Sequence, residues 1–165
     1  MKGHKELEVL VRILEPEKEV WKKIRSNDWR IIEDTYFNFP EIVLRIRNYD
    51  KGSDYDLAYK ENVFKGGRWL YAKEYETMVG EEIYDILEKL GYKPTVKIEM
   101  TKYFCPNGIE IQKVKKLGLF MEVEGKNRKE IWERIKKTGI KVSEEFGIGK
   151  PDMMLKLKNN KKLRK

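Results

Sequence analysis

Glutamate and arginine residues alternate with apolar residues near the start of the chain, in the run from Glu6 to Ile13. Alternate residues of an extended strand point to the same side, so Glu6, Glu8 and Arg12 share one face and the apolar residues at odd positions share the other. One face of this segment therefore suits a hydrophobic core, and the opposite face suits charged ligands.

Three later segments also carry two like charges at alternate positions. The pairs are Arg45 and Arg47, Glu74 and Glu76, and Glu122 and Glu124. Any one pair is ordinary on a strand face exposed to water, but four pairs on separate strands indicate one shared charged surface. Arginine binds phosphate oxygens through two parallel hydrogen bonds, and carboxylates are ligands for Mg²⁺ or Mn²⁺. The pattern therefore favours a site for a phosphorylated ligand and a divalent cation.

Turn signals and apolar periodicity divide the chain into strands and helices that can bring these pairs together. The expected strands cover residues 6–13, 29–37, 42–49, 55–64, 69–79, 96–104, 109–114 and 119–124. The expected helices cover 16–26 and 83–90, and a third begins after Asn127, which forms a capping-box pattern with Glu130. The sequence thus predicts an α+β fold, an eight-stranded antiparallel β-barrel or tunnel with a charged interior and outer helices.

Length and composition limit the alternatives. The 165 residues fit one domain, expected over residues 1–150, and the lysine-rich residues 151–165 are expected to form a solvated basic tail. Apolar residues make up 40% of the chain, which is too hydrophobic for a disordered protein. The net charge of +8 favours anionic partners.

The scarcity of cysteine and histidine restricts the chemistry further. Cys105 is the only cysteine and His4 the only histidine, which excludes an intramolecular disulfide and argues against a cysteine or histidine metal site and a catalytic triad. No apolar segment approaches the length that spans a membrane. We therefore expect a cytoplasmic protein without a membrane partner. Any chemistry must therefore use carboxylates, lysine and arginine.

A series of short motifs follows the charged pairs along most of the chain. They are Glu6-x-Glu8, Asp34-x-Tyr36-Phe37, Leu44-Arg45-Ile46-Arg47, Tyr59-Lys60, Glu74-x-Glu76, Leu90-Gly91-Tyr92 and the segment from Leu117 to Glu124. These motifs occur in the same order in the CYTH superfamily of class IV adenylate cyclases and thiamine triphosphatases. The sequence therefore resembles this superfamily, in particular its archaeal cyclase-like branch. The resemblance implies an eight-stranded tunnel that binds a triphosphate through arginine and lysine and holds one or two divalent cations, Mg²⁺ or Mn²⁺, through glutamate.

The resemblance also implies roles for individual residues. The expected phosphate ligands are Arg12, Arg45, Arg47, Lys60 and Lys102, and the expected metal ligands are Glu6, Glu8, Glu74, Glu76, Glu122 and Glu124. The expected partner is a nucleoside or organic triphosphate, or inorganic polyphosphate, with nucleic acid a less favoured alternative. No residue is assigned as a catalytic acid, base or nucleophile.

Four positions depart from the family pattern. Leu10 stands where Glu-x-Glu-x-Lys has its lysine, Ala72 and Met100 stand where basic residues are common, and Gln112 stands where aspartate is usual. Arg12 is the nearest substitute for the lysine on the same strand face. Two classes of function therefore stay open: an enzyme, either an adenylate cyclase of class IV type or a triphosphate phosphohydrolase, and a catalytically degenerate module that binds nucleotide, polyphosphate or RNA.

Overall fold

Ten antiparallel strands form one sheet in the computed structural model, which describes residues 4–65, 68–146 and 148–162, without the side chains of 4–6, 64–65, 68–71 and 161–162. The strands are β1 (His4–Glu6), β2 (Glu8–Ile13), β3 (Asp28–Phe37), β4 (Val43–Tyr49), β5 (Tyr55–Lys65), β6 (Arg68–Val79), β7 (Pro94–Cys105), β8 (Ile109–Val114), β9 (Gly118–Glu124) and β10 (Val142–Glu145). Their order across the sheet is β1-β6-β5-β4-β3-β7-β8-β9-β2-β10. All eight expected strands are present. The count is ten because the first expected strand divides at Leu7 and because β10 is additional.

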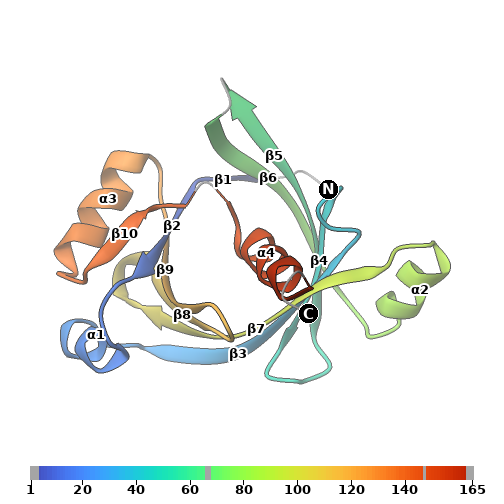
Figure 1. Cartoon of the computed structure of the whole chain (residues 1–165), viewed down its shortest axis with the longest axis horizontal. Helices are drawn as coiled ribbons and strands as arrows, with labels where there is room; N and C mark the ends of the chain where they lie inside the picture. The colour runs from blue at the N-terminus through green and yellow to red at the C-terminus, as the bar shows by residue number, and fades with distance from the viewer. Residues whose placement is uncertain (1–3, 66–67, 147, 163–165) are drawn as a thin grey trace.

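The N-terminal segment rolls this sheet into a tunnel. Only Leu7 separates β1 from β2, yet β1 pairs with β6 at one end of the sheet and β2 pairs with β9 near the other end. A single extended segment therefore spans the two ends, and Figure 1 shows the strands arranged as a ring. The sheet itself stays open, with β1 and β10 as its outermost strands. The expected β-barrel tunnel is confirmed.

The strand register places the charged pairs on one inner face. Directly opposed residues of antiparallel strands point to the same side of a sheet. Arg45 is opposed to Tyr36 on β3, and Glu122 is opposed to both Glu110 on β8 and Leu10 on β2. Following these pairs around the sheet leads from Arg45 to Glu122 on a single face, the one that lines the tunnel.

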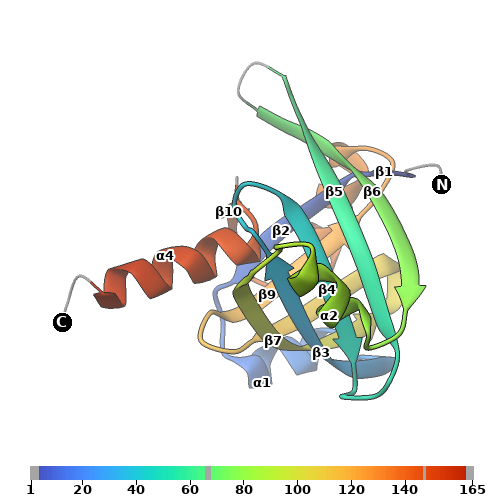
Figure 2. The same ribbon diagram turned by 90° about the vertical axis from the view of Figure 1, so that its right-hand side faces the viewer.

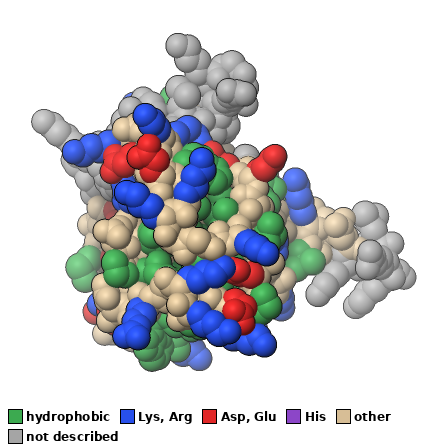
Figure 3. All heavy atoms as spheres, turned by 90° about the vertical axis from the view of Figure 1, so that its left-hand side faces the viewer, with side chains coloured by type: hydrophobic (Ala, Val, Ile, Leu, Met, Phe, Trp, Pro, Cys, Tyr) green, Lys and Arg blue, Asp and Glu red, His purple; other side chains and the backbone are tan. Residues whose placement is uncertain are grey.

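Three helices cover the outer face of the sheet. They are α1 (Glu17–Lys23), α2 (Ile83–Lys89) and α3 (Arg128–Lys137). The outward side chains of β2, β8 and β9 form a core with Val20 of α1 and Ile131 of α3. Leu87 of α2 packs on outward residues of β3 and β4. Figure 3 shows lysine, arginine, aspartate and glutamate side chains scattered over the side where α1 and α3 lie.

The predicted capping box of α3 is present. The side chain of Asn127 accepts a hydrogen bond of 2.9 Å from the backbone N–H of Glu130, which satisfies a donor in the first turn of the helix. Among the described residues, no helix is long and apolar enough to cross a membrane.

A fourth helix, α4 (Lys150–Lys162), occupies the segment for which the sequence suggested a solvated tail. Met153 and Met154 are buried against inward residues of the tunnel, including Ile98 and Met100 of β7. Figure 1 shows α4 within the ring of strands, and Figure 2 shows its C-terminal part projecting from the barrel. The many lysines of this segment predicted a solvated tail, but its apolar residues pack inside the tunnel.

Candidate functional site

Arg47 and Asp34 form an ion pair with two hydrogen bonds on the inner face. Nε of Arg47 donates to Oδ1 of Asp34 at 2.7 Å, and Nη2 donates to Oδ2 at 2.8 Å. Burial acts to raise the pKa of Asp34, but the charge and hydrogen bonds of Arg47 oppose it and hold that pKa at about 2. The carboxylate stays ionised, and much of the hydrogen-bonding capacity of Arg47 is already used.

Arg45, two residues earlier on β4, has looser contacts. Its Nη2 atom lies 3.3 Å from Oε1 of Glu74 and 3.3 Å from Oε1 of Glu76. Its Nε atom is buried and has no hydrogen-bond partner among the described residues. A buried donor without a partner is rare in proteins, because its desolvation is not offset by a bond. The Nε–H group of Arg45 can therefore donate a hydrogen bond to an anionic ligand.

Lys60 and Arg45 contact the same carboxylate, that of Glu74. Nζ of Lys60 is 3.1 Å from Oε2 of Glu74, whose other oxygen contacts Arg45. Glu74 is only 5% exposed, and it stands directly opposite Lys60 on the neighbouring strand. The two cations thus share one buried acidic partner.

A second group of charges lies on β7, β8 and β9. Lys102 contacts Oε2 of Glu110 at 2.6 Å and Oε1 of Glu122 at 3.6 Å. Lys150 of α4 donates to Oε2 of Glu122 at 2.8 Å and also to the side-chain oxygen of Gln112. Glu122 therefore has an ammonium group beside each of its oxygens.

The pKa of Glu122 connects the two groups of charges. Burial acts to raise this pKa, but Lys150, Lys102 and Lys60 lower it well below its ordinary value. Lys60 belongs to β5 and Glu122 to β9, so charges on different walls of the tunnel act on each other. The two groups of charges are therefore coupled through Glu122.

The remaining expected residues have other surroundings, except that Glu76 also contacts Arg45. Arg12 donates to the backbone oxygen of Leu117 at 2.6 Å, and its guanidinium lies over the ring of Phe120 at 4.9 Å. Glu8 and Glu124 are opposed in register, with Glu124 exposed, and Glu76 is more exposed than Glu74. The expected metal ligand Glu6 has a side chain outside the described part of the structure.

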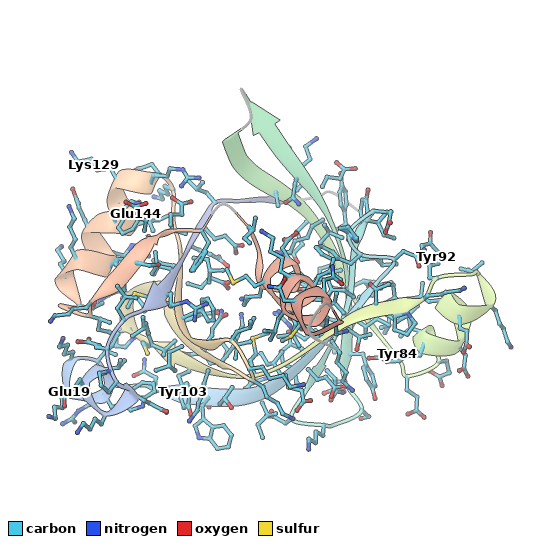
Figure 4. All side chains as sticks on the ribbon, in the orientation of Figure 1. Glu19, Tyr84, Tyr92, Tyr103, Lys129 and Glu144 are labelled. Atoms are coloured by element: carbon cyan, nitrogen blue, oxygen red, sulfur yellow. The ribbon has the colours of Figure 1, made fainter. Side chains whose placement is uncertain are left out.

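Four polar residues of the tunnel received no role from the sequence. They are Asp34, Glu110, Gln112 and Lys150, of which Gln112 had been noted only as a departure from the family pattern. Asp34 alternates with Tyr36 in a quoted motif and could have been found by that spacing. Lys150 gave no comparable signal, because it lies in a segment without strand character. Figure 4 shows strand side chains directed into the ring around α4, whereas the labelled Glu19, Tyr84 and Lys129 lie at the periphery.

Two of the carboxylates expected to bind a metal, Glu74 and Glu122, are paired with lysine and arginine in the described structure. Within residues 4–65, 68–146 and 148–162, apart from the omitted side chains, no three histidine, cysteine, aspartate or glutamate side chains lie together in a way that could hold a metal ion. Glu74 contacts Arg45 and Lys60, while Glu122 contacts Lys102 and Lys150. Lysine and arginine side chains therefore occupy the positions beside Glu74 and Glu122 that a metal ion would need.

A cavity of about 480 Å³ lies at the end of β7 opposite to α4. Its lining includes Arg30, Tyr49, Asp56 and Phe104. Asp56 is directly opposed to Arg47 in the sheet, so the cavity adjoins the Arg47–Asp34 pair. Met153 and Met154 of α4 pack among other inward residues of the tunnel.

The family model of the CYTH domain matches residues 4–157. The chain belongs to the CYTH family. The match ends within α4, at residue 157. No curated protein matches the sequence at a significant level.

Solved structures share the fold of this CYTH domain. A conserved hypothetical protein from Pyrococcus furiosus is 22% identical, with a TM-score of 0.70 over 88% of this chain and 99% of that chain. A putative adenylate cyclase from Vibrio parahaemolyticus is 14% identical, with a TM-score of 0.66 over 94% and 99%. A putative adenylyl cyclase from Hippeastrum, described as having a dominant triphosphatase activity, is 14% identical, with a TM-score of 0.62 over 88% and 92%. At these identities the likeness concerns the fold.

Proposed function

We propose that this CYTH domain binds the triphosphate group of a nucleoside or organic triphosphate, or inorganic polyphosphate, inside the tunnel and processes it with Mg²⁺ or Mn²⁺. The observation that carries the proposal is the buried Nε of Arg45, which has no partner among the described residues. Arg45 belongs to a group of cations that also includes Lys60 and Lys102, all on the inner face. Cations clustered in a partly enclosed site attract anions strongly.

Charge balance supports a role for a divalent cation. A phosphate group that bonds to Arg45 and Lys60 would compete with Glu74, their present partner. A buried carboxylate that loses its counter-ions is strongly destabilising, so an additional cation would be needed nearby. Such a cation would neutralise the charge of the phosphate oxygens and of the displaced carboxylate.

Hydrolysis of the triphosphate is the reaction we place first. It requires positioned phosphate oxygens and an attacking water, and the cationic cluster meets the first requirement. Cyclisation of ATP additionally requires that the ribose 3′-hydroxyl be held in line with the α-phosphorus. The triphosphatase activity described for the Hippeastrum protein agrees with this order. A cytoplasmic site of action belongs to the same proposal.

A non-catalytic binding module is the second candidate. It is favoured by the pairing of the buried Glu74 and Glu122 with lysine and arginine, which leaves no ready-made metal site among the described side chains. Leu10, directly opposed to Glu122, also takes the place of a family lysine on the inner face. Such a domain would bind nucleotide, polyphosphate or RNA without turnover.

The deciding experiment compares binding with turnover. Purified protein is incubated with ATP, thiamine triphosphate or tripolyphosphate and Mg²⁺ or Mn²⁺, and cyclic AMP, orthophosphate and pyrophosphate are separated. Binding of tripolyphosphate is measured by calorimetry on the wild type, on Arg45→Met and on the control Arg25→Met, which changes an exposed arginine. Turnover supports the enzyme, binding without turnover supports the module, and equal affinity of all three proteins removes Arg45 from the site.

A further inference from the structure

Tyr36 stands directly opposite Arg45 in the sheet and shares its inward face. We propose that the hydroxyl of Tyr36 is a second, uncharged ligand for the phosphate group that Arg45 binds, so that this group accepts a hydrogen bond from each side chain. The inference rests on the proposed function, because it takes Arg45 as a phosphate ligand. It adds to the same site a binding residue that the sequence placed only in a motif.

The ring of Tyr36 is fixed by apolar neighbours. Tyr36 is 6% exposed and belongs to the same buried cluster as Leu10 and Met154. The ring of Phe39 meets it edge to face, with the two centroids 5.9 Å apart. A ring held in this way keeps its hydroxyl on one axis, so little side-chain freedom is lost when a ligand binds there.

The hydroxyl lies among the charges of the candidate site. Burial raises the pKa of Tyr36 to about 12, and the charge of Asp34 acts in the same direction. The positive charges of Arg45, Arg47 and Lys60 oppose this rise, so all three lie within electrostatic reach of the hydroxyl. At neutral pH the hydroxyl keeps its proton and can donate a hydrogen bond to an anion.

Two neighbouring donors lack a partner in the part of the chain that the structure describes. The backbone oxygen of Tyr36 accepts a hydrogen bond from Thr95, but its hydroxyl bonds to no described residue. The buried Nε of Arg45 has no described partner either. By contrast, Tyr49 on the same face donates to Oδ2 of Asp56 at 2.6 Å. Because directly opposed residues have Cβ atoms about 5 Å apart, the two donors can serve one phosphate group.

The inference is tested by binding of tripolyphosphate without metal. Calorimetry compares the wild type, Tyr36→Phe and the control Tyr103→Phe, which changes an outward tyrosine packed against Trp21. We expect Tyr36→Phe to bind about three- to tenfold more weakly than the wild type, the effect of one hydrogen bond from a neutral donor. Tyr103→Phe should bind like the wild type. Equal affinity of Tyr36→Phe and the wild type would overturn the inference.

Thermal denaturation separates a binding role of the hydroxyl from a structural one. Since the hydroxyl has no partner among the described residues, Tyr36→Phe should melt within about 2 °C of the wild type. A larger fall in the melting temperature would show that the hydroxyl stabilises the fold, and would overturn its assignment as a ligand.

The dependence of affinity on salt separates a neutral ligand from a charged one. Arg45→Met removes a positive charge, so its affinity should fall less steeply with salt than that of the wild type. Tyr36→Phe removes no charge, so its affinity should stay below that of the wild type by the same factor at every salt concentration. A shallower salt dependence in Tyr36→Phe would mean that the substitution disturbs the charged neighbours, which contradicts the inference.

The two variants also distinguish this inference from the proposed function. If Arg45→Met weakens binding and Tyr36→Phe does not, the inference fails and the proposed site at Arg45 stands. If neither variant weakens binding, both fail.

Discussion

Arg47 and Asp34 are joined by two short hydrogen bonds across the β3–β4 pair, while Arg45, on the same strand and the same face, has only contacts of 3.3 Å. Two arginines with the same sequence spacing therefore differ in their availability. Arg47 is held by a fully buried carboxylate, and Arg45 has a buried donor that no described residue satisfies. We infer that Arg47 mainly stabilises the fold and that Arg45 mainly binds the ligand.

Replacing Asp34 by asparagine should destabilise the protein strongly. The change leaves the positive charge of Arg47 in the interior without its counter-ion, which typically costs about 3 to 5 kcal/mol. Urea denaturation at pH 7 measures the loss in the free energy of unfolding. Glu133→Gln, an exposed change on α3, is the control and should cost less than about 0.5 kcal/mol. A loss for Asp34→Asn as small as that of the control would show that the ion pair does not stabilise the fold.

The same pair predicts a dependence of stability on pH. The pKa of Asp34 is lowered in the folded protein, to about 2, so its contribution is fully present above the pKa of the unfolded chain and is lost as the pH falls. The window lies between about pH 4 and pH 2, and the contribution amounts to roughly 2 kcal/mol. The difference in stability between the wild type and Asp34→Asn should shrink by roughly 2 kcal/mol over this window. A constant difference down to pH 2 would contradict the assignment.

The two arginines should respond differently to the same substitution. Arg45→Met is expected to weaken tripolyphosphate binding roughly tenfold to hundredfold, the usual effect of one charge-assisted hydrogen bond. It should cost less stability than Arg47→Met, because Lys60 still pairs with Glu74. Arg47→Met is expected to lower stability by about 3 kcal/mol, because it leaves Asp34 buried and unpaired. Calorimetry and urea denaturation on both variants measure the two effects. Identical profiles for the variants would refute the division of roles.

The methionines of α4 should stabilise the whole domain. Met154 is 5% exposed among inward residues of the tunnel, so Met154→Ala should cost about 2 to 4 kcal/mol through lost burial and a cavity. Leu90→Ala removes a side chain that is 67% exposed and should cost less than about 1 kcal/mol. Thermal denaturation of both variants is the measurement. If Met154→Ala melts like the wild type, the docked helix contributes nothing to the stability of the barrel.

The period-two alternation was sufficient to predict the strands and the shared face of Arg45 and Glu122. This succeeds because the side-chain direction in a strand follows directly from its sequence position. The ion-pair partner of each charged residue was not predictable. The two hydrogen bonds between Asp34 and Arg47, for example, depend on the register of β3 against β4. Arg12 shows the same limit: it is on the correct strand, but its guanidinium contacts Leu117 and Phe120.

The helix α4 was missed for a different reason. Its many lysines suggested a solvated tail, although Pro151 and Asp152 in its first turn are typical of a helix start. The insertion of Lys150 between Glu122 and Gln112 depends on how α4 packs in the tunnel. No local pattern in the sequence encodes that placement.

The position of Leu7 between two pairing partners has a consequence for synthesis of the chain. The segment that contains β1 and β2 is translated before its partner strands. In the folded protein β1 pairs with β6, and β2 pairs with β9. Until residues 118–124 leave the ribosome, β2 lacks that neighbour and exposes an apolar face that invites aggregation. The alternating charges Glu8 and Arg12 lie on its other face and discourage pairing with foreign strands. The residues that line the mature tunnel can thus also protect the nascent chain.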